Sequence, residues 1–337
     1  MDKLTSERYQ RQTVLPDFGE EKQAILSKSK VLIVGVGGLG TPVLQYLTGM
    51  GVGTIGVVDG DKVSLSNLQR QVIFKESDIG SSKVQAATNH LRHLNSLTQF
   101  VEFDEMLMKE NAESIFLPFD LVVDCTDDIA TRYLINDTCE KLKIPFVYGA
   151  LYRHEGQVSV FNYKGGPTYR DAFPDDSVTV ENCNEIGVLG ALPGIVGTYQ
   201  AMEAVKVLTG LGHCLSGRLL IIDVANTEHH IFSFDKRKEP LKKLGGDNSN
   251  LSWDDMKSID SHNFHFIDIR DSIQFERHHD ARFENIPLNM LAGFEPVKEN
   301  VLIVCQQGKT SKQAAAILKS SFPSLKVFQV QGGYNAL

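Results

Sequence analysis

The sequence predicts an α/β protein with two domains, a larger one built on a mixed sheet and a smaller one after it. Three observations support this fold class. Residues 31–59 have the pattern of a strand, a glycine-rich turn, a helix and a second strand. Residues 236–252 are first charged and then rich in Gly, Asn and Ser, as linkers often are. Beyond them the pattern of strands and helices starts again, and 337 residues leave room for two domains.

The segment 31–59 predicts a nucleotide site. VLIV at 31–34 is typical of a strand buried on both faces, and Gly35, Gly37 and Gly40, with Gly38 between them, follow it in G-x-G-x-x-G spacing. Such a turn lets phosphates approach the backbone and the N-terminus of the next helix, as in a Rossmann-like domain. Asp59 ends the second strand, where a carboxylate can accept hydrogen bonds from a ribose. These residues alone leave an NAD-dependent oxidoreductase open.

Composition and charge narrow the class of protein. Hydrophobic residues make up 42% and charged residues 23%, which is ordinary for a globular chain. A net charge of −8 predicts neither a nucleic-acid-binding nor a membrane-binding face. Residues 1–30 contain no apolar leader, so we expect a cytoplasmic protein. Five widely spaced cysteines predict free thiols instead of a disulfide framework.

Polar residues flank the glycine unit on both sides. Residues 3–30 read as a helical lead-in that carries Arg11, for which a solvated helix face is the simplest interpretation. After Asp59, Asn67 and Arg70 belong to a polar cluster that we expect near the phosphates. Lys83 opens a predicted helix at 83–94, where an exposed lysine is the default.

The next predicted strand, FDLVVDCTDD at 119–128, ends in a threonine and acids where it gives way to a loop. Either Asp127 or Asp128 can hold Mg²⁺ beside nucleotide phosphates, and either can instead cap the helix that follows. Strands are predicted at 145–150 and 156–163, the second antiparallel and half exposed.

The remaining segments complete both domains. The uncharged stretch 186–202 is rich in small residues and predicts a tightly packed helix, in the core or alternatively at a dimer interface, with the core as the simpler interpretation. Two strands follow at 217–226 and 229–235. We therefore expect a first domain over 1–235, a linker over 236–250 and a second domain over 251–337. Strands at 265–271, 301–308 and 326–333 and a helix at 312–321 make up the second domain.

Cys305 is the candidate nucleophile of the second domain. It ends the apolar strand VLIV and precedes QQGKTS, so backbone N–H groups, a helix N-terminus and Lys309 favour a thiolate and would also stabilise a persulfide. A buried structural cysteine is the alternative interpretation.

With these residues in view, the first domain resembles the ubiquitin-activating-enzyme-like adenylyltransferases of the molybdopterin-synthase and thiamine sulfur-carrier pathways. The resemblance covers about 5–235 and rests on RYQRQ, GVGGLG, VDGDKVSLSNLQRQ, the lysine of IGSSKV, DCTDD and CNEIGVLGALPG. The second domain, about 251–337, resembles a rhodanese through IDIRD and CQQGKTS.

This resemblance assigns roles to matching positions. It implies that Asp59 holds the ATP ribose and that Asn67, Arg70 and Lys83 contact the phosphates. It further implies that Asp127 binds Mg²⁺ and that Arg11 reaches the ATP site of the partner subunit in a homodimer. Cys183 matches a cysteine that some relatives bond covalently to the carrier protein. These roles replace the solvent-exposed interpretations of Arg11 and Lys83.

The sequence departs from the family at the structural zinc site. Many relatives carry two CxxC pairs, but PTYRD puts Thr168 and Asp171 where one pair would fall, and no later CxxC exists. A four-thiolate zinc site is therefore not expected, and ATP and Mg²⁺ are the cofactors that the resemblance implies.

The activity implied is adenylylation of the C-terminal Gly-Gly of a ubiquitin-like sulfur carrier, most simply the small subunit of molybdopterin synthase. The rhodanese domain would then supply persulfide sulfur, loaded by a donor such as a cysteine desulfurase. The thiamine-pathway carrier is an alternative substrate. An NAD-dependent oxidoreductase and a non-catalytic carrier-binding scaffold are the competing classes.

Overall fold

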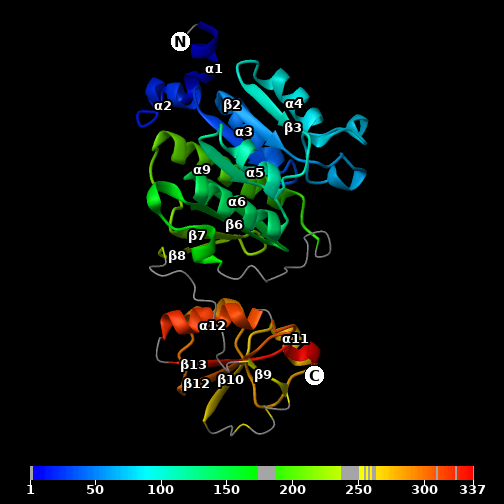
Figure 1. The fold of residues 1–337 in the computed structure, drawn as a ribbon, viewed down its shortest axis with the longest axis vertical. Helices are drawn as coiled ribbons and strands as arrows, with labels where there is room; N and C mark the ends of the chain where they lie inside the picture. Colours follow the sequence, from blue (N-terminus) through cyan, green and yellow to red (C-terminus); the bar gives the residue numbers. More distant parts are fainter. Residues whose placement is uncertain are drawn as a thin grey trace. The chain divides into compact units, whose positions relative to one another are not determined.

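The computed structural model describes residues 3–173, 187–236, 250–253, 256, 259, 263–308, 310–322 and 325–336. The chain divides into two compact units, Met1–Pro240 and Leu241–Leu337, which are described separately here. Most of the predicted linker at 236–250 lies outside the described residues. The predicted α/β class is confirmed in both units (Figure 1).

The first unit is built on an eight-stranded mixed sheet with the order β3-β2-β1-β4-β5-β6-β7-β8. The first five strands run parallel, whereas β6, β7 and β8 are added antiparallel. The strands are β1 Lys30–Val34, β2 Thr54–Val58, β3 Gln99–Phe103, β4 Leu121–Asp124, β5 Phe146–Tyr152, β6 Glu155–Phe161, β7 Arg218–Asp223 and β8 Glu228–Ser233.

Helices cover both faces of the parallel part of this sheet (Figure 1). Val31 and Ile33 of β1 pack in one core with α3, α4 and α9, while Leu32 and Val34 pack in a second core with α5 and α6. This alternation follows from the two-residue repeat of a strand. The α-helices are α1 Lys3–Thr13, α2 Gly19–Leu26, α3 Gly40–Met50, α4 Lys83–Leu94, α5 Lys109–Phe116, α6 Ile129–Leu142, α7 Tyr169–Ala172 and α9 Ala191–Thr209, with short 3₁₀ segments at η1 Leu65–Asn67, η2 Glu76–Asp78 and η3 Tyr163–Gly165.

Helix α9 confirms the expectation of a core helix rich in small residues. It packs against α3, and a Cβ on Gly197 would lie 2.6 Å from the carbonyl oxygen of Leu39. The predicted strand at 229–235 is also present as β8, but all of its residues are exposed.

The second unit has a five-stranded parallel sheet with the order β11-β10-β12-β13-β9. Val301 and Ile303 of β12 face a core formed with α12, and Leu302 and Val304 face a second core on the other side. Its elements are β9 Asn250–Leu251, β10 Phe264–Asp268, α11 Ser272–Arg277, β11 Glu284–Asn285, η4 Leu288–Gly293, β12 Asn300–Val304, α12 Thr310–Ser321, β13 Lys326–Val330 and η5 Gly333–Ala336.

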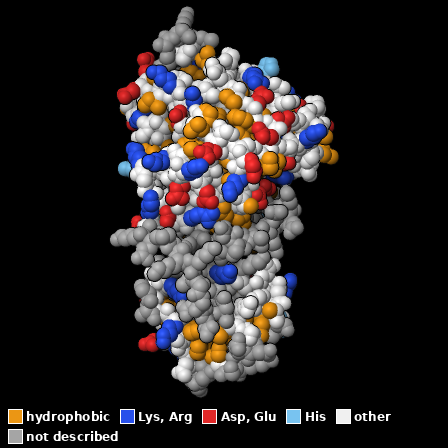
Figure 2. Space-filling view, in the orientation of Figure 1, with side chains coloured by type: hydrophobic (Ala, Val, Ile, Leu, Met, Phe, Trp, Pro, Cys, Tyr) orange, Lys and Arg blue, Asp and Glu red, His pale blue; other side chains and the backbone are white. Residues whose placement is uncertain are grey.

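Exposed hydrophobic side chains of the first unit lie in small separate groups among charged ones on the face shown in Figure 2. Among the described helices, none combines the length and the apolar character needed to cross a bilayer.

Candidate active site

The predicted nucleotide residues come together at one edge of the first sheet. Strands β1, β2 and β4 run parallel, so their carboxyl ends share this edge. Strand order reverses between β1 and β4, which is where open α/β sheets bind ligands. The backbone N–H of Gly35 donates to the carbonyl of Val58 at 2.9 Å, and that of Cys125 donates to Val34 at 2.9 Å. Three loops therefore leave the sheet side by side.

The glycine turn is too tightly packed for side chains except at its middle. Gly35 has φ +93°, and a Cβ on Gly40 would lie 2.0 Å from the carbonyl oxygen of Gly35. A Cβ on Gly38 would meet Pro193 of α9 at 2.9 Å, whereas at Gly37 the nearest atom is 3.9 Å away. No side chain caps α3. The N–H of Thr41 donates to the carbonyl of Gly37 at 3.1 Å, and the N-terminus of the helix presents its positive end to an anion. This cradle fits a nucleotide phosphate.

Asp59 holds the glycine turn in place. Its carboxylate accepts the backbone N–H of Val36 at 2.7 Å and that of Asp61 at 2.8 Å. Each carboxylate oxygen can accept a second hydrogen bond. Asp59 is half-buried just after β2 and so retains the capacity to bind a ribose.

Arg70 and Asn67 lie on the loop after β2. Arg70 donates to the carbonyl of Ser66 at 2.9 Å, and its Cδ is 3.6 Å from where a Cβ of Gly38 would be. Asn67 Oδ1 accepts the backbone N–H of Ser64 at 3.1 Å, which closes the η1 turn. Arg70 is therefore beside the glycine turn, and its contact with the phosphates stays a prediction.

Lys83 is a buried lysine, contrary to the exposed default for its type. Its Nζ lies 2.7 Å from Asp61 Oδ2, and only 8% of the side chain is exposed. Lys83 begins α4, whose N-terminus is capped by the hydroxyl of Ser82. Since a buried ammonium needs a counter-charge, Asp61 fixes it next to the loop that carries Asp59.

The two neighbouring aspartates of the acidic loop have different roles. Asp128 caps α6, because its carboxylate accepts the N–H of Thr131 at 2.7 Å and the hydroxyl of Thr131 at 2.6 Å. Asp127 is exposed and makes no hydrogen bond or ion pair with any described residue. A magnesium site in nucleotide enzymes commonly uses one or two carboxylates together with phosphates. Of the two candidates, only Asp127 has neither carboxylate oxygen engaged by a described residue, since Asp128 uses its Oδ2 as the cap.

Buried polar residues behind this loop were missed by the sequence analysis. Asp124 pairs with Arg132 of α6, with Nε to Oδ2 at 3.1 Å, and Gln200 of α9 donates to the carbonyl of Asp124 at 2.6 Å. Burial raises the pKa of Asp124 to about 6, although the guanidinium lies beside it. An acid at the end of an apolar strand was the available signal for this residue.

Gln71 is a second buried polar residue next to the glycine turn. It is 2% exposed, and its Oε1 has no hydrogen-bond partner among the described residues. Its side chain is the nearest neighbour of Gly37 across the open part of the cradle. An unpaired buried acceptor costs about 1–3 kcal/mol, so it fits a site completed by a ligand.

The second unit places Cys305 at the end of β12, beneath the N-terminus of α12. The thiol is 2% exposed, and its Sγ accepts the N–H of Ser311 at 3.4 Å. Tyr334 donates its N–H to the carbonyl of Cys305 at 3.0 Å. Lys309 and Cys183 lie outside the described residues.

A family model described as the ThiF family matches residues 9–243. The chain belongs to the ThiF family. It is 35% identical over 379 residues to "Adenylyltransferase and sulfurtransferase MOCS3-1" of Zea mays, covering 98% of this chain and 80% of that protein. It is also 35% identical over 381 residues to "Adenylyltransferase and sulfurtransferase MOCS3" of Caenorhabditis briggsae, covering 99% of this chain and 94% of that protein. The resemblance to an adenylyltransferase fused to a rhodanese is confirmed.

Solved structures agree on the fold of the ThiF-family unit. The crystal structure of SeMet PaaA superposes with a TM-score of 0.61 at 24% identity, covering 70% of this chain and 76% of that one. Escherichia coli MccB with ATP gives 0.60 at 19% identity, covering 69% and 72%. At such identities the likeness concerns the fold alone.

Arg11 of this ThiF-family chain lies apart from any described partner. It is exposed near the end of α1, and the apolar residues Val14 and Leu15 that follow are 64% and 50% exposed. The interpretation of Arg11 as a residue that acts on a partner subunit stays a prediction.

The loop where many relatives would carry zinc is closed by hydrogen bonds. The backbone N–H and the hydroxyl of Thr168 both donate to Asp171 Oδ2, at 2.7 and 3.0 Å. Aromatic rings of Tyr169, Phe161 and Phe234 then pack next to it. A hydroxyl and a carboxylate committed to each other do not fit a thiolate zinc site. In the described part of the chain, no three His, Cys, Asp or Glu side chains cluster as metal ligands.

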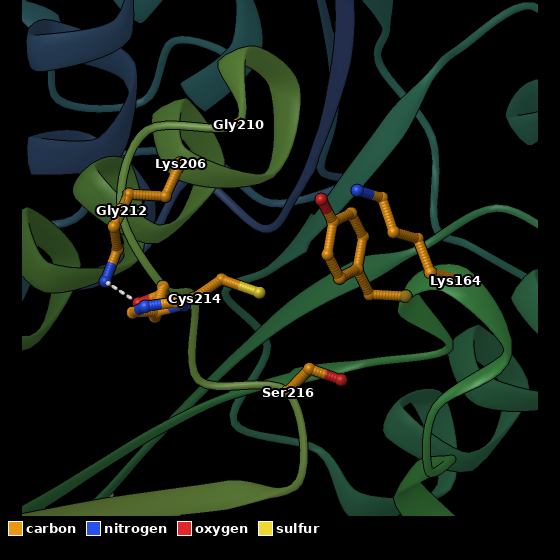
Figure 3. Close-up of a pocket in the computed structure, with 8 residues that line it drawn as sticks. Lys164, Lys206, Gly210, Gly212, Cys214 and Ser216 are labelled. Carbon is orange, nitrogen blue, oxygen red and sulfur yellow. Dashed lines mark hydrogen bonds between the residues drawn. The ribbon is translucent and has the colours of Figure 1, made fainter. Parts of the chain in front are cut away.

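A cavity of about 250 Å³ elsewhere in the first unit contains none of the predicted site residues (Figure 3). Lys164, Lys206, Cys214 and Ser216 are among the residues that line it. Lys206 is ion-paired with Glu203 and donates to the carbonyl of His213, so its charge is already compensated. This cavity therefore adds nothing to the nucleotide site.

Proposed function

We propose that this protein adenylylates the C-terminal Gly-Gly carboxylate of a ubiquitin-like sulfur-carrier protein and then converts it to a thiocarboxylate. The observation that carries the proposal is the convergence of the glycine cradle, Arg70, Lys83 and Asp127 at one sheet edge. A cysteine loop in the second unit supplies the complementary chemistry. Relatives named adenylyltransferase and sulfurtransferase support both halves.

In the first step the carrier carboxylate attacks the α-phosphate of ATP, giving an acyl-adenylate and pyrophosphate. The chain positions the reactants and compensates charge: the glycine cradle and Arg70 face the phosphates, and Lys83 stands behind them. Asp59 orients the ribose. Asp127 would hold Mg²⁺, which neutralises phosphate charge when bound.

In the second step Cys305 carries a persulfide supplied by a donor such as a cysteine desulfurase. The terminal sulfur attacks the acyl-adenylate, AMP leaves, and an acyl disulfide joins the carrier to Cys305. A second thiol, for which we propose Cys183, attacks the Cys305 sulfur and releases the thiocarboxylate. The resulting disulfide between the two cysteines is reduced by an external thiol.

We further propose a cytoplasmic homodimer in which Arg11 enters the ATP site of the partner subunit. Exposed Arg11 next to exposed Val14 and Leu15 supports this assignment, because such a surface suits burial against a second copy. The preferred carrier is the small subunit of molybdopterin synthase, and the thiamine-pathway carrier is the second candidate.

The experiment is pyrophosphate exchange into ATP with each purified carrier, followed by mass measurement of the carrier. We expect exchange that depends on a carrier ending in Gly-Gly, and a carrier gaining about 16 Da once a persulfide source is added, as oxygen is replaced by sulfur. Absence of exchange with every Gly-Gly carrier, or NAD reduction instead, would refute the proposal. A carrier shortened by its last two glycines is the matched control.

We also propose that the protein needs no structural zinc. Treatment with a chelator should leave the melting temperature of the ATP-free protein unchanged, because the Thr168–Asp171 hydrogen bonds close the loop. A large loss of stability together with released zinc would contradict this.

A further inference from the structure

We propose that Arg132 is a positioning residue that holds the backbone of the 124–128 loop so that the Asp127 carboxylate remains free for Mg²⁺. The inference rests on the proposed function, because it takes Asp127 as the magnesium ligand. Arg132 itself is 7% exposed on α6 and acts through the loop.

Asp124, Thr126 and Asp128 of this loop each use their side chain in a hydrogen bond, whereas Asp127 does not. Asp124 Oδ1 accepts the N–H of Thr126 at 3.0 Å, and the hydroxyl of Thr126 accepts the N–H of Asp128 at 3.1 Å. The carboxylate of Asp128 is used as the cap of α6. Among the described residues of the loop, Asp127 therefore presents the one carboxylate with both oxygens unused.

Arg132 joins the buried Asp124 to the backbone of the loop at Thr126. Its Nε donates to Asp124 Oδ2, and its Nη2 donates to the carbonyl of Thr126 at 2.8 Å. Thr126 is the residue directly before Asp127, so its peptide plane sets the direction in which Asp127 leaves the sheet. The same nitrogen lies 3.5 Å from the carbonyl of Gly149 on β5.

The guanidinium of Arg132 is held in place on two sides. It lies over the ring of Tyr148, with 4.9 Å to the ring centroid, and the carboxylate that it pairs with is fully buried. A planar fork with several donors can bind a carboxylate and a carbonyl together, whereas an ammonium is a point charge on a flexible stem. Residues behind a metal ligand commonly tune metal affinity by about 10- to 100-fold.

A purely structural role for Arg132 predicts a different outcome. Loss of packing would weaken all binding at the site, with and without metal. Loss of positioning would weaken only the part of ATP binding that depends on Mg²⁺. The two roles can therefore be separated by measuring binding instead of turnover.

The experiment is calorimetric titration of the full-length protein with ATP, once with Mg²⁺ and once with EDTA. The variants are Arg132→Gln, Arg132→Lys and Asp127→Asn. Arg170→Gln is the matched control, because Arg170 of α7 is ion-paired at 2.7 Å with Asp137 of α6, which lies about two and a half helical turns beyond Asp128. Melting curves establish that each variant is folded.

We expect Mg²⁺ to raise ATP affinity in the natural protein and in Arg170→Gln. Asp127→Asn should lose this gain, and Arg132→Gln should lose about 10- to 100-fold of it with little change in EDTA. If Arg132→Gln does not fold, Arg132→Lys decides, because it keeps the charge beside Asp124 but loses the fork.

Other outcomes refute specific parts. If the folded Arg132 variant retains the full Mg²⁺ gain, or weakens ATP binding equally in EDTA, the positioning role is wrong while the proposed function stands. If Asp127→Asn retains the gain, its assignment as the metal ligand fails, and the inference fails with it. If the natural protein binds no ATP, the proposed function itself is wrong.

Discussion

Both units place a buried aspartate at the end of a parallel strand and pair it with an arginine, but they do so differently. Asp124 ends β4 and pairs with Arg132, eight residues later on the following helix. Asp268 ends β10 and pairs with Arg270, two residues later in the same turn. The first pair connects a strand to a helix, whereas the second joins two residues of the same turn.

The two arginines therefore contact different groups next to their candidate sites. Arg132 binds a backbone carbonyl in the loop before Asp127. Arg270 instead donates to the side chain of Gln306, next to Cys305, at 3.1 Å. The cysteine loop has a further support, because Asn335 donates its N–H to the carbonyl of Gln306 at 2.8 Å. The first unit thus offers an exposed carboxylate, and the second a buried thiol on a loop held by several bonds.

The largest expected effect separates the two chemistries. Cys305→Ala should abolish thiocarboxylate formation and let acyl-adenylate accumulate, because the persulfide has no attachment site. Asp127→Asn should lower carrier-dependent pyrophosphate exchange by roughly 10²- to 10³-fold, in line with the loss of one charge-stabilising group. Exchange kinetics and the mass of the carrier measure both effects. Thiocarboxylate made by Cys305→Ala from a persulfide source would show that the second unit is not the sulfur donor.

A smaller effect is expected from two aspartate–arginine pairs inside the second unit. Asp280 and Arg282 repeat the local geometry of Asp268 and Arg270, with Nη2 to Oδ2 at 2.7 Å in both pairs. The side chains of the first pair are 0% and 4% exposed, against 27% and 31% in the second.

Burial should therefore determine how much stability is lost when each ion pair is broken. Arg270→Gln leaves a buried charge without its partner and should destabilise the second unit by about 3–5 kcal/mol. Arg282→Gln should cost about 1 kcal/mol or less, because water screens that pair. Chemical denaturation followed by hydrogen exchange in β12 measures both. Equal losses would contradict this prediction, because they would show that burial does not set the cost of breaking these pairs. Arg270→Gln also removes the cation–π contact with Tyr334, 3.6 Å from the ring centroid.

The sequence was sufficient for the parts of the fold with strong local patterns. The run 31–34 and the glycines after it predicted β1, the turn and α3, because a buried strand and a phosphate turn each need particular residue types. Strand β3 was not predicted. Its residues QFVEF are exposed or half-buried at an edge of the sheet and show no apolar run.

The site was only partly predictable for a similar reason. Residue type alone made Lys83 a surface residue, and only the family resemblance moved it to the site, because the sequence does not show that Asp61 folds back to it. Residue type likewise left Asp127 and Asp128 equivalent, the resemblance favoured Asp127, and the structure adds that Asp128 caps α6. The pairing of Asp124 with Arg132 depends on how α6 packs on the sheet, which no local pattern encodes.

A pH titration tests the same comparison between buried and exposed aspartates. Burial raises the pKa of Asp124 from its ordinary 3.8 to about 6, whereas the hydrogen bond from Arg282 lowers the pKa of Asp280. Between about pH 4 and 6, folded Asp124 retains a proton that the unfolded chain has lost. Its contribution to stability therefore falls as pH rises, by about 3 kcal/mol across the window. Asp280 acts in the opposite sense, because its contribution is present above its unfolded pKa and is lost as pH falls through the lower folded value.

Protection of β4 amides against hydrogen exchange, measured from pH 4 to 7, isolates the Asp124 contribution when the natural protein is compared with Asp124→Asn. As pH rises, the free energy of opening of the natural protein should fall relative to that of Asp124→Asn, because the aspartate ionises and the asparagine cannot. Other carboxylates of the first unit, such as Asp137 with its lowered pKa, titrate equally in both proteins and cancel. If the two profiles run parallel, Asp124 is ionised throughout, and its attraction to Arg132 outweighs burial. The two pairs would then be distinguished by how their arginines are connected, one to a following helix and one within the same turn.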